Sequence, residues 1–194
     1  MTKILLCLLL FLVSATSYAQ TASFTYQLNG RKQNTQIERD GPEHSKNPFV
    51  KFVGEWTLKN DDWKQNWGGK DEAVKIPNHH TVSGEVNTDM SLLSIIDGPQ
   101  PNGHIFWSYD PASKTFHHLS SFGTSRSGVG NGTVDQNGNL TIKVSFSDEA
   151  KGTYRIYTYK WISRDSYELM SVQYNDKDQA TGLFYGGTFV RIRN

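Results

Sequence analysis

From residue 54 onward, the sequence consists of short segments in which every second residue is apolar, separated by turn signals. The segment 140–146, for example, reads Leu-Thr-Ile-Lys-Val-Ser-Phe. Successive side chains of a β-strand point to opposite faces, so this period of two places one face against a core and the other in water. No stretch after residue 53 keeps a helical pattern over the length of an ordinary helix. These features predict an all-β domain.

Turn sequences connect the predicted strands. Asn137-Gly138 lies between the predicted strand segments 129–134 and 140–146, and Asp110-Pro111 lies between the segments 104–109 and 115–122. Glycine and asparagine readily adopt positive φ, and proline presets the φ of the first turn position, so both pairs favour hairpins. A meander of about ten strands with short loops tends to close on itself, because closure removes exposed strand edges. We therefore expect an antiparallel up-and-down β-barrel of about ten strands.

The first 19 residues follow the pattern of an export signal. Lys3 supplies the positive charge, residues 4–13 form an apolar run, and Ser17-Tyr18-Ala19 offers small residues for cleavage. The apolar run is shorter than the roughly 20 residues that a membrane-spanning helix needs. We expect residues 1–19 to be a signal peptide, and the mature protein to be periplasmic or secreted.

Composition narrows the class of protein further. The sole cysteine, Cys7, lies in the predicted signal, so the mature chain would have no disulfide, thiolate metal site or cysteine nucleophile. Exported eukaryotic domains often carry disulfides, so the lack of cysteine in the mature chain favours a bacterial host. Removing Lys3 reduces the 20 basic residues to 19, equal to the 19 acidic residues. The chain therefore has no basic excess of the kind found in nucleic-acid-binding proteins. We expect a small-molecule partner, no nucleic acid and no membrane span. The sequence leaves the oligomeric state open.

The chain between the signal and the strands is polar. Residues 20–48 have little apolar periodicity, so we expect a loosely ordered tether. Alternatively, the alternation within residues 23–28 forms an extra edge strand. Residues 49–194 then make up the barrel domain.

The start of the first strand resembles a known signature. Gly54-Glu55-Trp56 is similar to the Gly-x-Trp motif of the lipocalin and calycin superfamily. That resemblance implies that Trp56 closes one end of the barrel beneath an arginine of the last strand, where Arg191 stands, and gives Gly54, Trp56 and Arg191 a structural role. The segments around 109–116 and 130–138 also resemble lipocalin-like exported bacterial proteins of unassigned function. The late Thr-Asp pair of true lipocalins has no counterpart, which favours a ten-stranded relative.

Aromatic residues mark the candidate binding site. They recur at every second position in the segment 157–161 and again at 107–109. Rings with a few polar groups suit an amphipathic ligand; alternatively, tyrosine is simply a good strand former. We predict that the barrel holds a small hydrophobic or amphipathic molecule without a cofactor, and that Arg155 anchors an anionic group. The predicted ligand-binding residues are Trp107, Tyr109, Arg155, Tyr157, Tyr159 and Trp161.

Other residues suggest alternative functions. A site of His80, His104 and His118 would suit zinc or haem iron, although rim histidines with ordinary hydrogen bonds explain the same pattern. We identify no catalytic residue, but a histidine with a carboxylate would make the barrel a hydrolase or isomerase acting on a sugar or lipid. Trp63 and Trp67, expected in a loop, would alternatively mark a partner-binding surface module. Asp148 and Glu149 lie in a predicted turn, which we expect them to solubilise.

Overall fold

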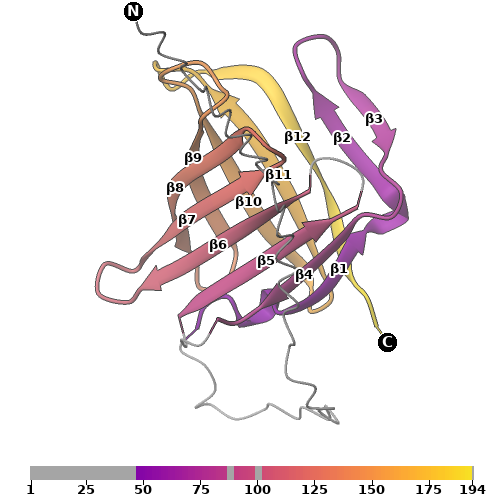
Figure 1. The fold of residues 1–194 in the computed structure, drawn as a ribbon, viewed down its shortest axis with the longest axis vertical. Helices are drawn as coiled ribbons and strands as arrows, with labels where there is room; N and C mark the ends of the chain where they lie inside the picture. The colour runs from indigo at the N-terminus through magenta and orange to yellow at the C-terminus, as the bar shows by residue number, and fades with distance from the viewer. Residues whose placement is uncertain (1–46, 87–89, 99–101, 194) are drawn as a thin grey trace, which may run out of the picture. The chain divides into compact units, whose positions relative to one another are not determined.

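The computed structural model describes residues 47–86, 90–98 and 102–193. This part of the chain forms twelve β-strands and two single-turn 3₁₀ helices (Figure 1). No helix in it has the length and apolar character needed to cross a bilayer. The predicted signal peptide and most of the predicted tether lie outside the described residues. The elements are η1 (Val50–Phe52), β1 (Gly54–Leu58), η2 (Lys59–Asp61), β2 (Asp62–Asn66), β3 (Glu72–Lys75), β4 (His80–Gly84), β5 (Ser91–Asp97), β6 (Gly103–Asp110), β7 (Thr115–Phe122), β8 (Arg126–Val134), β9 (Leu140–Phe146), β10 (Tyr154–Ser163), β11 (Ser166–Tyr174) and β12 (Ala180–Arg191).

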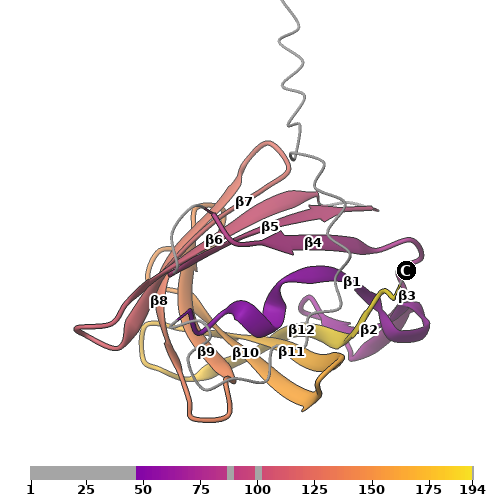
Figure 2. The ribbon, with the colours of Figure 1, turned by 90° about the horizontal axis from the view of Figure 1, so that it is seen from below.

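Ten of the strands close into a ring. The pairing order is β1-β4-β5-β6-β7-β8-β9-β10-β11-β12, and β12 pairs back with β1, with every pairing antiparallel. Figure 2 shows the ring from below, with the indigo segment that contains η1 lying across it. From β4 to β12 each strand pairs with its neighbour in the chain. The predicted all-β, antiparallel up-and-down barrel of about ten strands is therefore confirmed.

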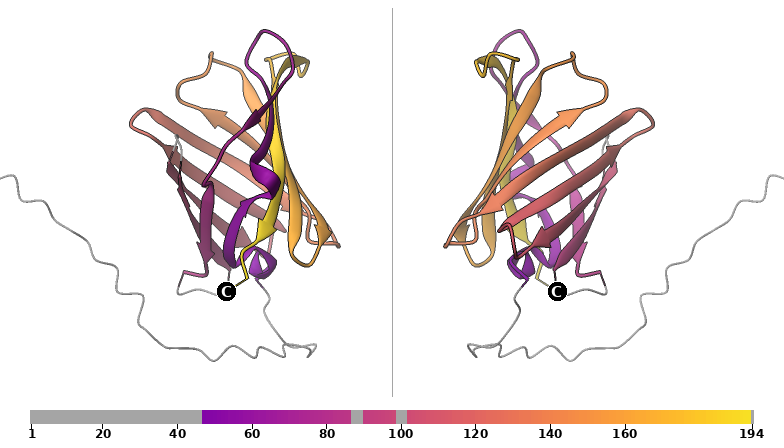
Figure 3. Two further views of the ribbon diagram at one scale, coloured as in Figure 1. Left: turned by 90° about the vertical axis from the view of Figure 1, so that its right-hand side faces the viewer. Right: turned by 90° about the vertical axis from the view of Figure 1, so that its left-hand side faces the viewer.

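The two remaining strands form a hairpin beside the ring. β12 pairs with β1 through Phe189–Arg191 and with β2 through Phe184–Gly186, so one long strand serves both. Between β1 and β2 the chain turns at η2, where Asn60 and Asp61 adopt positive φ. Figure 3 shows the purple β2–β3 hairpin standing alongside the yellow β12. The sequence prediction of a loop at Trp63 was wrong: Trp63 lies in β2, whose polar residues hide the alternation.

Burial alternates along β7 and β9. In β9 every second residue is buried, and the bounds of β7 and β9 match the predicted segments 115–122 and 140–146. β8 begins at Arg126, three residues before the predicted start at Val129. The inward faces of all these strands surround one interior, which is divided between a packed end and a cavity.

The packed end of the barrel is filled by the chain that precedes β1. The ring of Phe52 lies 4.7 Å from that of Trp161 and 5.3 Å from that of Tyr167. Phe49 is fully buried and contacts Trp107 at 5.4 Å. Asn47, expected in the tether, is 1% exposed, so the packed domain already includes it. Burying aromatic side chains against one another is the main stabilising contribution at this end.

Contacts between Arg191 of β12 and the chain around Trp56 join the packed end to the last strand. The Arg191 guanidinium lies 4.2 Å from the centre of the Trp56 ring, a cation–π contact. Its Nη1 and Nη2 donate to the carbonyl oxygens of Val53 and Lys51, at 2.6 and 2.9 Å. Gly54 has φ +131°, and a Cβ there would collide with Nη1 of Arg191, so glycine is required on both grounds. The three residues lie together as the lipocalin resemblance implies.

We expect Arg191→Lys to lower the free energy of unfolding by about 1–2 kcal/mol, because lysine lacks the planar fork that meets two carbonyls and an indole face. Urea unfolding followed by tryptophan fluorescence measures the change. Arg193→Lys is the matched control, since Arg193 is 77% exposed and shares the partner Asp165. Equal effects of the two substitutions would contradict this role for Arg191.

Candidate ligand-binding cavity

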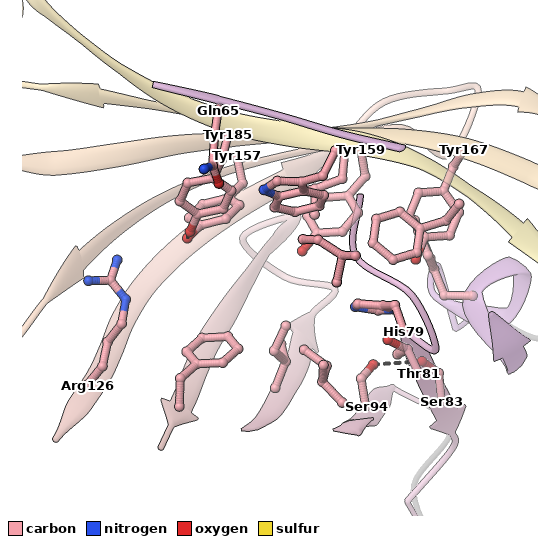
Figure 4. A pocket seen from close by; sticks show the side chains of 18 of the residues that line it. Gln65, His79, Thr81, Ser83, Ser94, Arg126, Tyr157, Tyr159, Tyr167 and Tyr185 are labelled. Atoms are coloured by element: carbon pink, nitrogen blue, oxygen red, sulfur yellow. Dashed lines mark hydrogen bonds between the residues drawn. The ribbon is translucent and has the colours of Figure 1, made fainter. Parts of the chain in front are cut away.

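A cavity of about 530 Å³ occupies the barrel interior above the packed end. Ten of its lining residues are aromatic, and they come from both sides of the ring as well as from β2 (Figure 4). Polar side chains reach it at a few places only. The aromatic lining residues are Phe52, Trp63, Trp67, Trp107, Phe122, Tyr157, Tyr159, Tyr167, Tyr185 and Phe189.

β10 turns its predicted binding face inward. Tyr157 and Tyr159 line the cavity, as does Trp107 of β6. Tyr109 instead packs at the closed end, edge-on to Phe49 with ring centres 6.4 Å apart. Trp161 also belongs to the packed end, where its indole Nε1 donates to the carbonyl of Gly138 at 3.0 Å. The structure therefore brings three of the predicted ligand-binding residues to the cavity.

Arg155 is buried beside the cavity, where its Nε is paired with a carboxylate and its Nη1 has no hydrogen-bond partner among the described residues. Its side chain is 2% exposed, and its Nε donates to Oε1 of Glu149 at 2.6 Å. The guanidinium lies 5.0 Å from the centre of the Tyr185 ring and 5.4 Å from that of Trp67. The predicted anionic anchor is thus already paired with a carboxylate of the protein.

Four charged side chains form a network next to these rings. Nη1 of Arg126 donates to both carboxylate oxygens of Asp148, at 2.6 and 2.8 Å, and its Nη2 donates to Glu149 at 2.9 Å. Arg126 and Asp148 line the cavity. The Glu149 side chain is only 8% exposed, so its expected role as a solubilising turn residue was wrong. Burial raises the pKa of Glu149, but the hydrogen bonds from Arg155 and Arg126 outweigh it and hold that pKa below its ordinary value.

Tyr157, Tyr159 and Tyr167 are neutral in the cavity wall. Removal from water raises the pKa of Tyr157 well above its ordinary value, and the nearby Tyr185 adds to this effect. The same removal raises the pKa values of Tyr159 and Tyr167. The hydroxyls of Tyr157 and Tyr185 are hydrogen-bonded to each other. This side of the cavity therefore offers ring surface and neutral hydroxyls.

His118 orients Trp107 from behind the lining. The indole Nε1 of Trp107 donates to Nδ1 of His118 at 2.9 Å, and an indole nitrogen can only donate. Nδ1 is therefore unprotonated, and Nε2 carries the hydrogen that it donates to Oγ of Ser120 at 2.9 Å. Burial lowers the pKa of His118 to about 4. The imidazole is neutral near pH 7 and serves as a fixed acceptor.

The other predicted histidines face away from the cavity. His104 is exposed, and His80 pairs with Glu55 at 3.1 Å, each side chain being about two-fifths exposed. His80, His104 and His118 therefore do not come together, and the described residues contain no cluster of three potential metal ligands. His79, not His80, lines the cavity, because it has the same parity as the inward residues Thr81 and Ser83. Burial lowers the pKa of His79.

Comparison with known proteins shows a similarity of fold. No family model matches the sequence, and no curated protein matches it. The S-type phycobiliprotein lyase CPES from Guillardia theta is 12% identical, with a TM-score of 0.51 over 75% of this chain and 91% of that one. EF1p2_mFAP2b bound to DFHBI is 11% identical, with a TM-score of 0.34 over 74% and 95% of the two chains. A DUF3598 protein of unknown function from Nostoc punctiforme is 8% identical, with a TM-score of 0.20 over 75% and 98%. The first similarity supports a shared barrel fold; lipocalin-like membership stays a prediction.

We expect the folded protein to lose stability as the pH falls from about 6.5 toward 4, because the unfolded chain takes up a proton that buried His118 does not accept. The loss should be smaller in His118→Gln, in which the amide oxygen still accepts from Trp107. Urea unfolding at pH 7 and pH 4.5 measures the difference. His117→Gln is the control on the exposed face, and an unchanged pH dependence in His118→Gln would refute the assignment.

We expect Glu149→Gln to lower the free energy of unfolding at pH 7 by about 3 kcal/mol, because it leaves two guanidinium groups without their shared carboxylate. The pKa of Glu149 is depressed from 4.5, so its contribution is complete above pH 4.5 and disappears as the pH falls through the lower, folded value. The gap between wild type and variant should therefore narrow in acid. Exposed Glu168→Gln is the control; a gap independent of pH would argue against the ion network.

Proposed function

We propose that this protein binds a small hydrophobic or amphipathic molecule inside the barrel and does not transform it. The observation that carries the proposal is the cavity of about 530 Å³ with its largely aromatic lining. Small-molecule pockets have volumes of roughly 300–1,000 Å³ and combine apolar walls with a few polar groups. We further propose that residues 1–19 direct export, so that binding takes place outside the cytoplasm.

Packing arguments also favour an occupant. Protein interiors are close-packed, and atoms that face a void lose the dispersion contacts that a neighbour would supply. The closed end of this barrel is filled by Phe49 and Phe52, so the same fold packs tightly where no space is needed. Trp67 lines the cavity while 57% exposed, which leaves a large ring at its rim for contact with a ligand.

The arrangement of histidines and carboxylates favours binding over catalysis. The hydrogen-bonded pair His80–Glu55 lies on the outer face of the barrel. Within the lining, both oxygens of Asp148 already accept from Arg126, so this carboxylate is not paired with His79. Trp63 and Trp67 line the cavity, which favours a role in ligand contact over a role as a partner-binding surface.

We expect the neutral fluorophore N-phenyl-1-naphthylamine to bind with one site per barrel and with enhanced emission. Ile96→Trp should weaken binding at least tenfold, because Ile96 lines the cavity and a larger ring there would occupy its volume. Fluorescence titration measures both. Ile95→Trp is the matched control, since the adjacent isoleucine is 45% exposed on the opposite face of β5.

The same titration can reject the proposal. Absence of saturable binding to the wild-type protein would count against a ligand-binding cavity. Equal weakening by Ile96→Trp and Ile95→Trp would place the fluorophore elsewhere on the protein. Circular dichroism of each variant establishes that the sheet is intact before affinities are compared.

A further inference from the structure

The two walls of the cavity differ in chemistry. The wall formed by β10, β11 and β12 presents Tyr157, Tyr159, Tyr167 and Tyr185, whose rings form the upper row in Figure 4. The facing strands β4 and β5 present small hydroxyl and aliphatic side chains instead. A ligand between these walls meets the tyrosine rings on one side. On the other side it meets the short side chains of β4 and β5, next to Trp107 of β6 and Phe122 of β7.

The aromatic wall is held rigid by its own contacts. Tyr167 stacks on Phe189 with ring centres 5.1 Å apart and an interplanar angle of 8°. Tyr185 stacks on Trp63 at 5.7 Å and 22°, and its hydroxyl is bonded to that of Tyr157. Rings fixed in this way lose little freedom on binding, and they favour a partner that is itself flat and rigid.

Apart from Gln65 and the tyrosine hydroxyls, polar groups lie at two opposite ends of the cavity. Figure 4 places Arg126 at one end and places Ser83, Ser94 and His79 at the other. The hydroxyls of Ser83 and Ser94 are 2.7 Å apart, so one of their two hydrogens joins them and the other is left over. Each end can therefore form hydrogen bonds with a ligand that spans the cavity.

Charge at the arginine end is balanced within the protein. Arg126 and Arg155 contribute two positive charges, and Asp148 and Glu149 contribute two negative charges, within one hydrogen-bonded network. An additional ionised group would enter a mostly apolar cavity without a counter-charge, which is costly. A neutral acceptor could still receive a hydrogen bond from Arg126. The balance favours an uncharged ligand.

We infer that the ligand is a flat, uncharged, conjugated ring system with a hydrogen-bonding group at each end. This inference rests on the proposed function and specifies its ligand class. The flat centre would stack against the tyrosine wall, while its two ends meet Arg126 and the Ser83–Ser94 pair. A flexible aliphatic chain with the same end groups would lose more conformational freedom and gain no stacking.

Three competitors test this ligand class by displacing bound N-phenyl-1-naphthylamine. 4′,7-Dihydroxyflavone is flat with a hydroxyl at each end, flavone lacks the hydroxyls, and 1,10-decanediol has terminal hydroxyls on a flexible chain. We expect the dihydroxyflavone to displace the fluorophore at concentrations at least tenfold lower than either of the others. A smaller advantage over decanediol overturns the requirement for flatness, and a smaller advantage over flavone overturns the requirement for polar ends.

Failure of the proposed function is distinguishable from failure of the ligand class. If the barrel binds no small molecule, the fluorophore does not bind, and this is seen before any competitor is added.

Two variants then test the end contacts. Ser94→Ala should weaken the dihydroxyflavone about fivefold and leave flavone unchanged, because only the former uses the hydroxyl pair. Ser121→Ala, on the exposed face of β7, should change neither. Equal changes for both flavones, or none for either, would overturn the assignment of the Ser83–Ser94 end.

Discussion

The pairing of β1 with both β4 and β12 is the constraint on which the structure depends. It converts a meander with two edges into a ring, and the ring creates an interior that no open sheet would have. Arg191 supports this closure by joining the last strand to the chain before β1 through two carbonyls and the Trp56 ring. The packed end then fixes how much of the interior is left as a cavity.

The sequence predicts the bounds of β7 and β9 well. Segments 115–122 and 140–146 match β7 and β9. In β9 every second residue is apolar, which leaves a single choice of inward face, whereas the buried face of β7 also carries His118 and Ser120. β10 carries large rings on both faces, so its own pattern does not reveal which one is inside. The register with β9 decides it: Tyr157 lies opposite Ile142 and Tyr159 opposite Leu140, and both partners are buried. Transferring the face of β9 across that hairpin was the signal available in the sequence.

The remaining features depend on contacts between distant parts of the chain. Glu149 looks like a solvated turn residue because its partner Arg126 lies 23 positions earlier, and only the folded sheet brings the two together. β2 contains one apolar residue, Trp63, and none of its residues is fully buried, so its alternation is faint. His79 precedes β4, and its inward direction follows only once Thr81 is known to face the cavity. Such features are properties of the closed ring more than of any local segment.

We propose that the closed barrel encloses a space that one small molecule fills. A native mass spectrum of the protein purified from its own host tests this most directly. We expect one additional small molecule per chain, lost on denaturation and absent from protein in which Ile96→Trp fills the cavity. Repeated preparations that show only the mass of the bare chain would contradict it.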